Sequence, residues 1–188
     1  MLASASPRRA ALLAAAGFAF EVLPTGVDES PRPGEAPDAY VVRVAVAKAR
    51  AAAGRLHAEA GAAAVLGADT TVVVDDRMLG KPADDREAAE MIRRLSGRVH
   101  EVLTGVAIVR DGLVRTACER TRVRVAPLAE EEIAWYIATG EPRDKAGAYA
   151  IQGRFSRFVE AVEGSYTNVV GLPVATVYRL LRAASVPV

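Results

Sequence analysis

The chain has 188 residues, of which 51% are hydrophobic and 25% charged, and its formal net charge is +1. This composition is that of a globular protein and argues against a disordered chain, and the small net charge argues against a general surface for nucleic acid or membranes. The single cysteine, Cys118, excludes an internal disulfide and a cysteine-based zinc site, and no apolar run reaches the roughly 18–20 residues that cross a bilayer. We expect one cytoplasmic domain, residues 1–188, that acts on a small molecule without a nucleic-acid or membrane partner.

The first segment predicts a short strand, a polar loop and a helix. Residues 1–3 form the strand, and Ser6 precedes a proline at the first helical position. Gly17 ends the helix, and residues 18–23 alternate toward another strand. The two arginines and eleven uncharged residues of 8–20 also resemble an export signal. The capped helix explains the same residues, so we expect no export.

The next segment predicts a helix followed by a strand. Residues 38–59 carry apolar side chains at helical spacing, with Lys48 on the same face. We therefore expect the Lys48 stem to pack on apolar surface and its tip to reach solvent. Residues 64–68 predict a buried strand that ends at Asp69, and residues 71–74 continue as strand. A carboxylate at a strand end points toward a ligand crevice.

The centre of the chain predicts a capped helix and a hairpin. Asp84 and Glu87 form a capping box for a helix that ends near Leu95. The Asp111-Gly112 pair separates two alternating stretches, which is typical of a β-hairpin. The two strands of this hairpin are residues 99–109 and 113–125.

The last third of the chain predicts two helices separated by loops. Three glutamates open a helix over residues 130–139, where they suit the helix dipole. Residues 141–171 are expected to be loops with short strands, and Pro173 opens a helix that ends near Ala184. These elements together predict a mixed α/β fold with parallel and antiparallel strand pairs.

Basic residues supply candidate ligands for an anion. Ser6, Arg8 and Arg9 place hydroxyl, backbone N–H and guanidinium groups at a helix N-terminus, where anions bind. The alternative is a helix cap with two exposed arginines. The 24 basic residues are 21 arginines and three lysines. The lysines are Lys48, Lys81 and Lys145, which would suit phosphate oxygens as compact point charges, although chance also explains their positions.

Two acidic positions are candidates for metal binding or proton transfer. Glu29 follows Asp28 in a proline-rich loop, and Asp69 follows a buried strand. Carboxylates bind Mg²⁺ and accept protons from water. The alternatives are a solvated acidic pair and an aspartate that caps a turn. Carboxylates combined with several cations favour metal-assisted attack on a polyphosphate.

Three further residues carry weaker predictions. His57 is expected to be exposed near a helix end, and His100 to lie near a ligand-binding cleft. Cys118 lies on a hairpin strand, where packing is a better explanation than nucleophilic chemistry.

Nine motifs, in order along nearly the whole chain, resemble the Maf family of nucleoside triphosphate pyrophosphatases. The motifs are Ser4-Ala5-Ser6-Pro7-Arg8-Arg9, Val27-Asp28-Glu29, Ala47-Lys48-Ala49, Gly67-Ala68-Asp69-Thr70, Gly80-Lys81-Pro82, Leu95-Ser96-Gly97-Arg98-Val99-His100, Thr104-Gly105-Val106, residues 144–153 and Asn168-Val169-Val170-Gly171-Leu172-Pro173. All three lysines lie inside these motifs. The family's first strand is longer than the three residues before Ser4, which leaves open a native start upstream of Met1.

The resemblance implies a fold similar to that of the inosine triphosphate pyrophosphatases, with a mixed sheet and two lobes around a deep cleft. It also implies cleavage between the α and β phosphates with Mg²⁺ or Mn²⁺, and a homodimer. Asp69 matches the family's proton acceptor and, with Glu29, its metal ligands. The substrate-side residues implied by the same matching are Ser6, Arg8, Arg9, Lys48, Thr70, Lys81, Lys145 and Gln152.

Three of these residues distinguish branches of the family. Arg8, Thr70 and Gln152 match the branch that hydrolyses dTTP and UTP, and we expect a buried glutamine amide that presents one acceptor and two donors to a pyrimidine edge. We therefore expect a pyrimidine triphosphate pyrophosphatase that also clears modified bases. The alternatives are a 7-methyl-GTP pyrophosphatase of the same family and a nucleotide-sensing regulator of cell division that does not hydrolyse.

Overall fold

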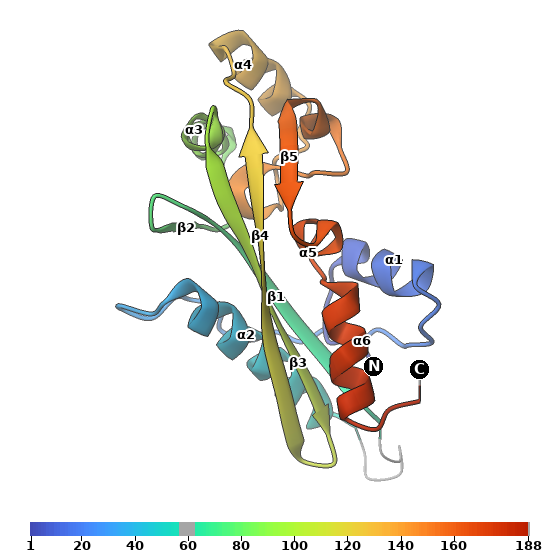
Figure 1. Ribbon diagram of the computed structural model, residues 1–188. Helices are drawn as coiled ribbons and strands as arrows, with labels where there is room; N and C mark the ends of the chain where they lie inside the picture. Colours follow the sequence, from blue (N-terminus) through green and yellow to red (C-terminus); the bar gives the residue numbers. More distant parts are fainter. Residues whose placement is uncertain (57–62, 188) are drawn as a thin grey trace. The chain divides into compact units, whose positions relative to one another are not determined.

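The computed structural model describes residues 1–56 and 63–187 and confirms a mixed α/β fold (Figure 1). The helices are α1 (Pro7–Ala15), α2 (Pro37–Ala53), α3 (Asp85–Leu95), α4 (Glu130–Ala138), α5 (Tyr166–Val170) and α6 (Val174–Ala183), with 3-10 turns η2 (Ala146–Ala148) and η3 (Arg154–Phe158). The strands are β1 (Val65–Val74), β2 (Arg77–Leu79), β3 (Val99–Arg110), β4 (Leu113–Val125) and β5 (Val159–Glu163). In the described part of the chain, no helix is both long and apolar enough to cross a membrane.

The five strands form one antiparallel sheet in the order β2-β1-β3-β4-β5. Val72 pairs with Leu79 at one edge, and Arg122 pairs with Glu163 at the other. The parallel strands that we expected near the N-terminus are reduced to isolated bridges, in which Leu2 pairs with Val22 and Leu66. The chain turns away at Ser4 to enter α1, so residues 1–3 are too short to continue the pairing.

The described residues divide into two compact units. The first unit contains the described residues of Met1–Thr70, Thr104–Glu119 and Gly171–Val188, and the second contains Thr71–Leu103 and Arg120–Val170. The chain passes from one unit to the other within β1, β3 and β4, and again after α5. Each unit is therefore assembled from segments that are far apart in the sequence.

In the first unit, helices cover both faces of the sheet (Figure 1). Successive side chains of a strand point to opposite faces, and β1 and β3 follow this alternation. One face packs against α2, and its core is Ala3, Ala45, Ala49, Ala52, Val65, Ala107 and Val109. The other face packs against α1 and α6, and its core is Leu2, Leu13, Leu66, Ala68, Val106, Ile108, Leu172, Val177 and Leu181.

Two glycines allow α2 to lie directly on the sheet. A Cβ atom added to Gly67 of β1 would overlap the carbonyl oxygen of Ala45, and one added to Gly105 of β3 would overlap that of Val41. Any larger residue at either position must push the helix away from the strand. These glycines therefore set the separation between α2 and the two strands beneath it.

The second unit contains an aromatic core and the predicted capped helix. Tyr136, Tyr149 and Phe155 are buried, and the rings of Tyr149 and Phe155 lie 4.8 Å apart. The α3 prediction is confirmed, because the Asp84 side chain accepts a hydrogen bond of 2.7 Å from the Glu87 backbone N–H. The apolar face of α3 is buried at Ala88, Met91, Ile92 and Leu95.

The β-hairpin is also confirmed, since β3 and β4 flank the predicted turn. Asp111 and Gly112 have φ angles of 50° and 75°, the left-handed conformations of a tight hairpin turn. Cys118 on β4 is exposed, so the prediction that it packs is wrong. The hairpin alternation places it on the solvent side of the strand.

Two predicted boundaries are wrong. Helix α2 ends at Ala53 rather than at residue 59, because Gly54 caps it and glycine disfavours a helix interior. His57 and residue 59 lie outside the described residues. Residues 65–74 form one continuous strand, so Asp69 lies in the middle of β1 and not at a strand end. The β-branched residues after Asp69 favour continued strand.

Candidate active site

Strand alternation sends Asp69 and Thr70 to opposite faces of β1. Gly67 and Asp69 share the face covered by α2, where the close approach at Gly67 brings Lys48 against Asp69. Thr70 shares the face covered by α1, where it meets Arg9. Two adjacent residues of one strand therefore contact two different helices.

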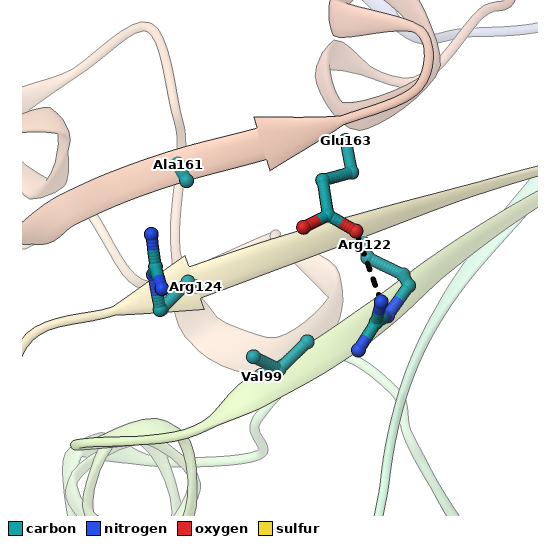
Figure 2. Close-up of a pocket in the computed structure, with 5 residues that line it drawn as sticks. All are labelled: Val99, Arg122, Arg124, Ala161 and Glu163. Carbon is teal, nitrogen blue, oxygen red and sulfur yellow. Dashed lines mark hydrogen bonds and ion pairs between the residues drawn. The ribbon is translucent and has the colours of Figure 1, made fainter.

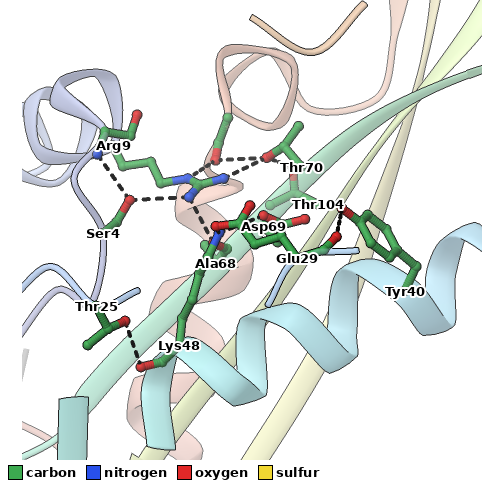
Figure 3. Close-up of polar contacts among 12 residues, drawn as sticks. Ser4, Arg9, Thr25, Glu29, Tyr40, Lys48, Ala68, Asp69, Thr70 and Thr104 are labelled. Carbon is green, nitrogen blue, oxygen red and sulfur yellow. Dashed lines mark hydrogen bonds and ion pairs between the residues drawn. The ribbon is translucent and has the colours of Figure 1, made fainter. Parts of the chain in front are cut away.

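Lys48 joins two carboxylates. Its Nζ lies 2.8 Å from Asp69 Oδ1 and 2.9 Å from Glu29 Oε1 (Figure 3). The side chains of Lys48 and Asp69 are 10% and 8% exposed, whereas that of Glu29 is 48% exposed. The Lys48 tip is thus paired inside the protein, and the prediction that it reaches solvent is wrong. The structure brings the two predicted metal ligands to one ammonium group.

The burial of this cluster alters its acid–base behaviour. Burial raises the pKa of Asp69, against the opposing effects of Lys48 and Arg9. Burial, together with the negative charges of Asp69 and Glu29, raises the pKa of Tyr40 to about 12. The Tyr40 hydroxyl donates to the Glu29 backbone carbonyl at 3.0 Å. A buried carboxylate with a raised pKa is a stronger base than an exposed one.

Arg9 braces the loop that precedes α1. Its Nε donates to the Gly171 carbonyl at 2.9 Å, and one terminal nitrogen donates to the Ala68 carbonyl at 2.8 Å and to Ser4 Oγ at 3.2 Å. The other terminal nitrogen donates to Thr70 Oγ1 at 3.1 Å. Arg9 is 9% exposed, and burial lowers its pKa. Its guanidinium therefore connects α1 to β1 and to Gly171, the residue at which the chain re-enters the first unit.

Thr70 and Thr104 link β1 to β3 beside this brace. Their hydroxyl oxygens lie 2.9 Å apart, and Thr70 Oγ1 also lies 3.3 Å from the Gly171 carbonyl oxygen. Thr104 is fully buried, and Thr70 is half-buried. The hydroxyl of Thr70 is thus oriented by neighbours on three segments.

The remaining candidates of the first unit lie at the start of α1. Ser6 is the N-cap residue of α1, as predicted, and Pro7 is its first residue. The Ser6 hydroxyl makes no capping bond; instead, the Ser6 backbone N–H donates to Ser4 Oγ at 3.2 Å. Arg8 and Ser6 are both half-buried.

The second unit holds Lys81, Lys145 and Gln152. The Gly147 backbone N–H donates to the Gly80 carbonyl at 3.0 Å, which places the Lys81 turn beside the loop that carries Lys145. Lys145 Nζ lies 2.8 Å from Asp144 Oδ1. Lys81 and Gln152 are exposed. Within this unit, two of the three predicted lysines thus lie on adjoining loops.

A small hollow on the β3–β4–β5 part of the sheet is a poor candidate for a ligand site (Figure 2). Its volume of about 30 Å³ suits one water molecule. It is lined by Val99, Arg122, Arg124, Ala161 and Glu163, and Arg122 is paired with Glu163 at 2.9 Å. None of these residues is a predicted site residue.

The chemistry of the Glu29–Asp69 pair fits a magnesium or manganese ion that shares its ligands with a substrate. Among residues 1–56 and 63–187, no three His, Cys, Asp or Glu side chains form a preassembled metal-binding set. Mg²⁺ commonly uses one or two carboxylates and completes its shell with water and substrate phosphates. Two carboxylates that converge on one cation, Lys48, satisfy that requirement.

Sequence reasoning missed several contributors to this site. Ser4, Thr104 and the Gly171 carbonyl lie within the motifs that we recognised, but their hydrogen bonds to distant segments were not visible in the sequence. Tyr40 lies outside those motifs.

His100 is 1% exposed and its Nε2 lies 2.7 Å from the Tyr149 hydroxyl oxygen, so it belongs to the core of the second unit.

The first unit thus has an α/β structure in which the buried Lys48–Asp69 pair lies beside the loop of serines and arginines at the start of α1. The family model Maf, whose description reads Maf-like protein, matches residues 1–184 of the chain. The chain belongs to this family, and the resemblance seen in the sequence is confirmed.

Curated relatives cover almost the whole chain. A protein of Koribacter versatilis (strain Ellin345) named dTTP/UTP pyrophosphatase is 53% identical over 99% of this chain and 94% of its own length. A protein of Anaeromyxobacter sp. (strain Fw109-5) with the same name is 53% identical over 100% of this chain and 90% of its own. A third protein with this name, from Symbiobacterium thermophilum, is 50% identical over 100% of this chain and 95% of its own length.

Proposed function

We propose that this protein hydrolyses dTTP, UTP and related pyrimidine nucleoside triphosphates to the monophosphate and pyrophosphate. The observation that carries the proposal is the convergence of Glu29 and Asp69 on Lys48. The names of relatives that are about half identical over nearly the full chain support the choice of substrate.

Asp69 acts as the general base in this proposal. Water attacks the α phosphorus, its proton passes to an Asp69 carboxylate oxygen, and the bond from that phosphorus to the oxygen bridging to the β phosphate breaks. Pyrophosphate leaves with that bridging oxygen. Lys48, at 2.8 Å, holds the carboxylate in place, and the raised pKa of Asp69 brings its basicity closer to neutral pH.

Cations and hydroxyls hold the substrate. Arg8 and Ser6 supply donors at the start of α1, and Arg9 adds positive charge while bracing the loop. Lys48, Lys81 and Lys145 are the further cations that membership of the Maf family assigns to the phosphate side of the substrate. Positive charge placed where negative charge develops lowers the barrier of phosphoryl chemistry.

Arg8, Thr70 and Gln152 select the pyrimidine. The exposed Gln152 amide offers an acceptor and two donors, which match the carbonyl and N–H groups of thymine and uracil. The sequence led us to expect a buried glutamine amide, whereas the Gln152 side chain is exposed.

Glu29 and Asp69 would hold a Mg²⁺ or Mn²⁺ ion together with substrate oxygens. When bound, such an ion polarises phosphate oxygens and lowers the pKa of water. Lys48 is already paired with both carboxylates, so it restrains their separation before any ligand arrives.

We further propose that residues 1–188 form one catalytic domain, with a fold similar to that of the inosine triphosphate pyrophosphatases and two lobes around a deep cleft. A cytoplasmic homodimer completes the proposal. Membership of the Maf family supports each of these statements. Sedimentation of the purified protein tests the dimer.

The function is tested with a panel of nucleoside triphosphates, with Mg²⁺ or Mn²⁺, in which the products are identified by chromatography. We expect dTTP and UTP to give the highest kcat/KM, with monophosphate and pyrophosphate in equal amounts. Preference for 7-methyl-GTP would contradict the pyrimidine assignment. Binding of dTTP without products under excess metal would contradict catalysis and favour a nucleotide-sensing regulator.

A further inference from the structure

The turn that carries Gln152 is fixed at both ends by polar groups from distant segments. The Gly153 backbone N–H donates to the Ala150 carbonyl at 3.1 Å and closes the turn. Inside it, Ile151 is 7% exposed, whereas Gln152 is exposed. The buried Ile151 side chain and the exposed Gln152 side chain therefore give this turn a defined inner and outer side.

On its N-terminal side, the turn is held by His100. His100 Nε2 lies 2.7 Å from the hydroxyl oxygen of Tyr149, the residue that precedes the turn. The two rings meet edge to face with centroids 5.3 Å apart, and both residues are buried. Burial lowers the pKa of His100 to about 4, so the imidazole is neutral near pH 7. This contact fastens the loop to β3.

On its C-terminal side, the turn is held by Glu141. The Glu141 carboxylate accepts hydrogen bonds from the backbone N–H of Arg154 at 2.9 Å and from the Tyr136 hydroxyl at 3.0 Å. A Cβ atom on Gly153 would overlap the same carboxylate, so a larger residue here would displace the Glu141 side chain from this position. A charged acceptor that receives several hydrogen bonds holds its partners more firmly than a neutral one.

We propose that His100 and Glu141 are positioning residues that hold the Ala150–Gly153 turn and thereby set the geometry with which Gln152 selects thymine or uracil. This inference rests on the proposed function. Neither residue touches substrate: His100 acts through Tyr149, and Glu141 acts through the backbone N–H of Arg154, which are the residues that flank the turn. A fixed amide discriminates between bases better than a mobile one, because a mobile amide adapts to the wrong pattern of donors and acceptors.

The test is the ratio of kcat/KM for dTTP to kcat/KM for dCTP. Cytosine presents an amino group and an acceptor nitrogen where thymine presents a carbonyl and an N–H. Tyr149→Phe removes one hydroxyl and keeps the ring, and we expect it to lower the ratio about fivefold. A loss of folded protein lowers both kcat/KM values by the same factor and leaves the ratio unchanged. Tyr166→Phe, at a tyrosine that is 49% exposed in the same unit, is the matched control and should not change the ratio.

A second background makes the test specific for Gln152. In a Gln152→Ala protein the ratio should already be low, and adding Tyr149→Phe should not lower it further. An unchanged ratio in Tyr149→Phe, or an equal further fall in the Gln152→Ala background, would overturn the inference. If Tyr149→Phe does not fold, Glu141→Gln carries the same expectation. A wild-type protein without preference for dTTP over dCTP would overturn the dTTP and UTP preference of the proposed function, whereas a wild-type preference that survives these variants would overturn this inference alone.

Discussion

Replacing Lys48 with methionine leaves a buried carboxylate without its partner. The Asp69 and Lys48 side chains are 8% and 10% exposed, so water screens their charges little. Removing one partner of a buried ion pair costs about 3–5 kcal/mol, and we expect Lys48→Met to lose about 3 kcal/mol of unfolding free energy at pH 7. The lower end applies because the pKa of Asp69 is already raised, so proton uptake relieves part of the cost.

The pH dependence of this loss has a defined sign. Without Lys48, the folded-state pKa of Asp69 rises further above its unfolded value, so the variant gains stability as pH falls from 7 to 5. Asp69→Asn in the same background removes the unpaired charge and should recover about half of the loss. Urea unfolding at pH 5 and pH 7 measures the unfolding free energies of wild type, the single variants and the double variant. Lys81→Met, at an exposed lysine, is the control. Equal losses at both pH values, or strictly additive single and double variants, would refute the reasoning.

Three further changes test the fold. Burial lowers the pKa of His100 to about 4, so the stability that the neutral imidazole contributes is complete above pH 6.5 and is lost as pH falls toward 4. This loss amounts to about 3 kcal/mol of unfolding free energy. The difference in unfolding free energy between wild type and His100→Gln should therefore shrink over that range. Gly67→Ala should lower the unfolding free energy by about 3 kcal/mol, measured by thermal unfolding. The control Gly26→Ala, whose new Cβ meets no neighbouring atom, should lower it by less than about 0.5 kcal/mol. Equal losses would show that the contact of Gly67 with α2 is unimportant. Asp84→Ala should cost about 1 kcal/mol by losing the bond to Glu87, and an unchanged melting temperature would contradict this.

Local signals in the sequence predicted many elements correctly. The Asp84 capping box and the Asp111-Gly112 turn depend on residues within four positions of one another, so their physics is contained in a short window. The end of α2 was less predictable, because the alanines around Gly54 suit a helix as well as the observed turn. The long β1 strand was divided in the prediction at Asp69, since a charged residue inside a buried strand is costly unless it is paired.

The site was predicted as a set of residues and not as a set of contacts. Glu29, Lys48 and Asp69 were all named, but the sequence placed the Lys48 tip in solvent because its partner lies 21 positions away on another element. Arg9 was named as a phosphate ligand, and its bonds to Gly171 and Ala68 depend on the folded chain. The contact between Lys48 and Asp69 follows from the close approach of α2 at Gly67, which no local pattern encodes.

The central claim is that Asp69 accepts the proton of the attacking water. The most direct measurement is kcat/KM for dTTP in Asp69→Asn, compared with Asp28→Asn as the control, because Asp28 is exposed and its carboxylate accepts from the Ser30 backbone N–H. Loss of a general base predicts a fall of about 10²–10⁴-fold for Asp69→Asn with dTTP binding retained, and a change of less than about threefold for Asp28→Asn. Turnover by a folded Asp69→Asn protein at the wild-type rate would contradict the account.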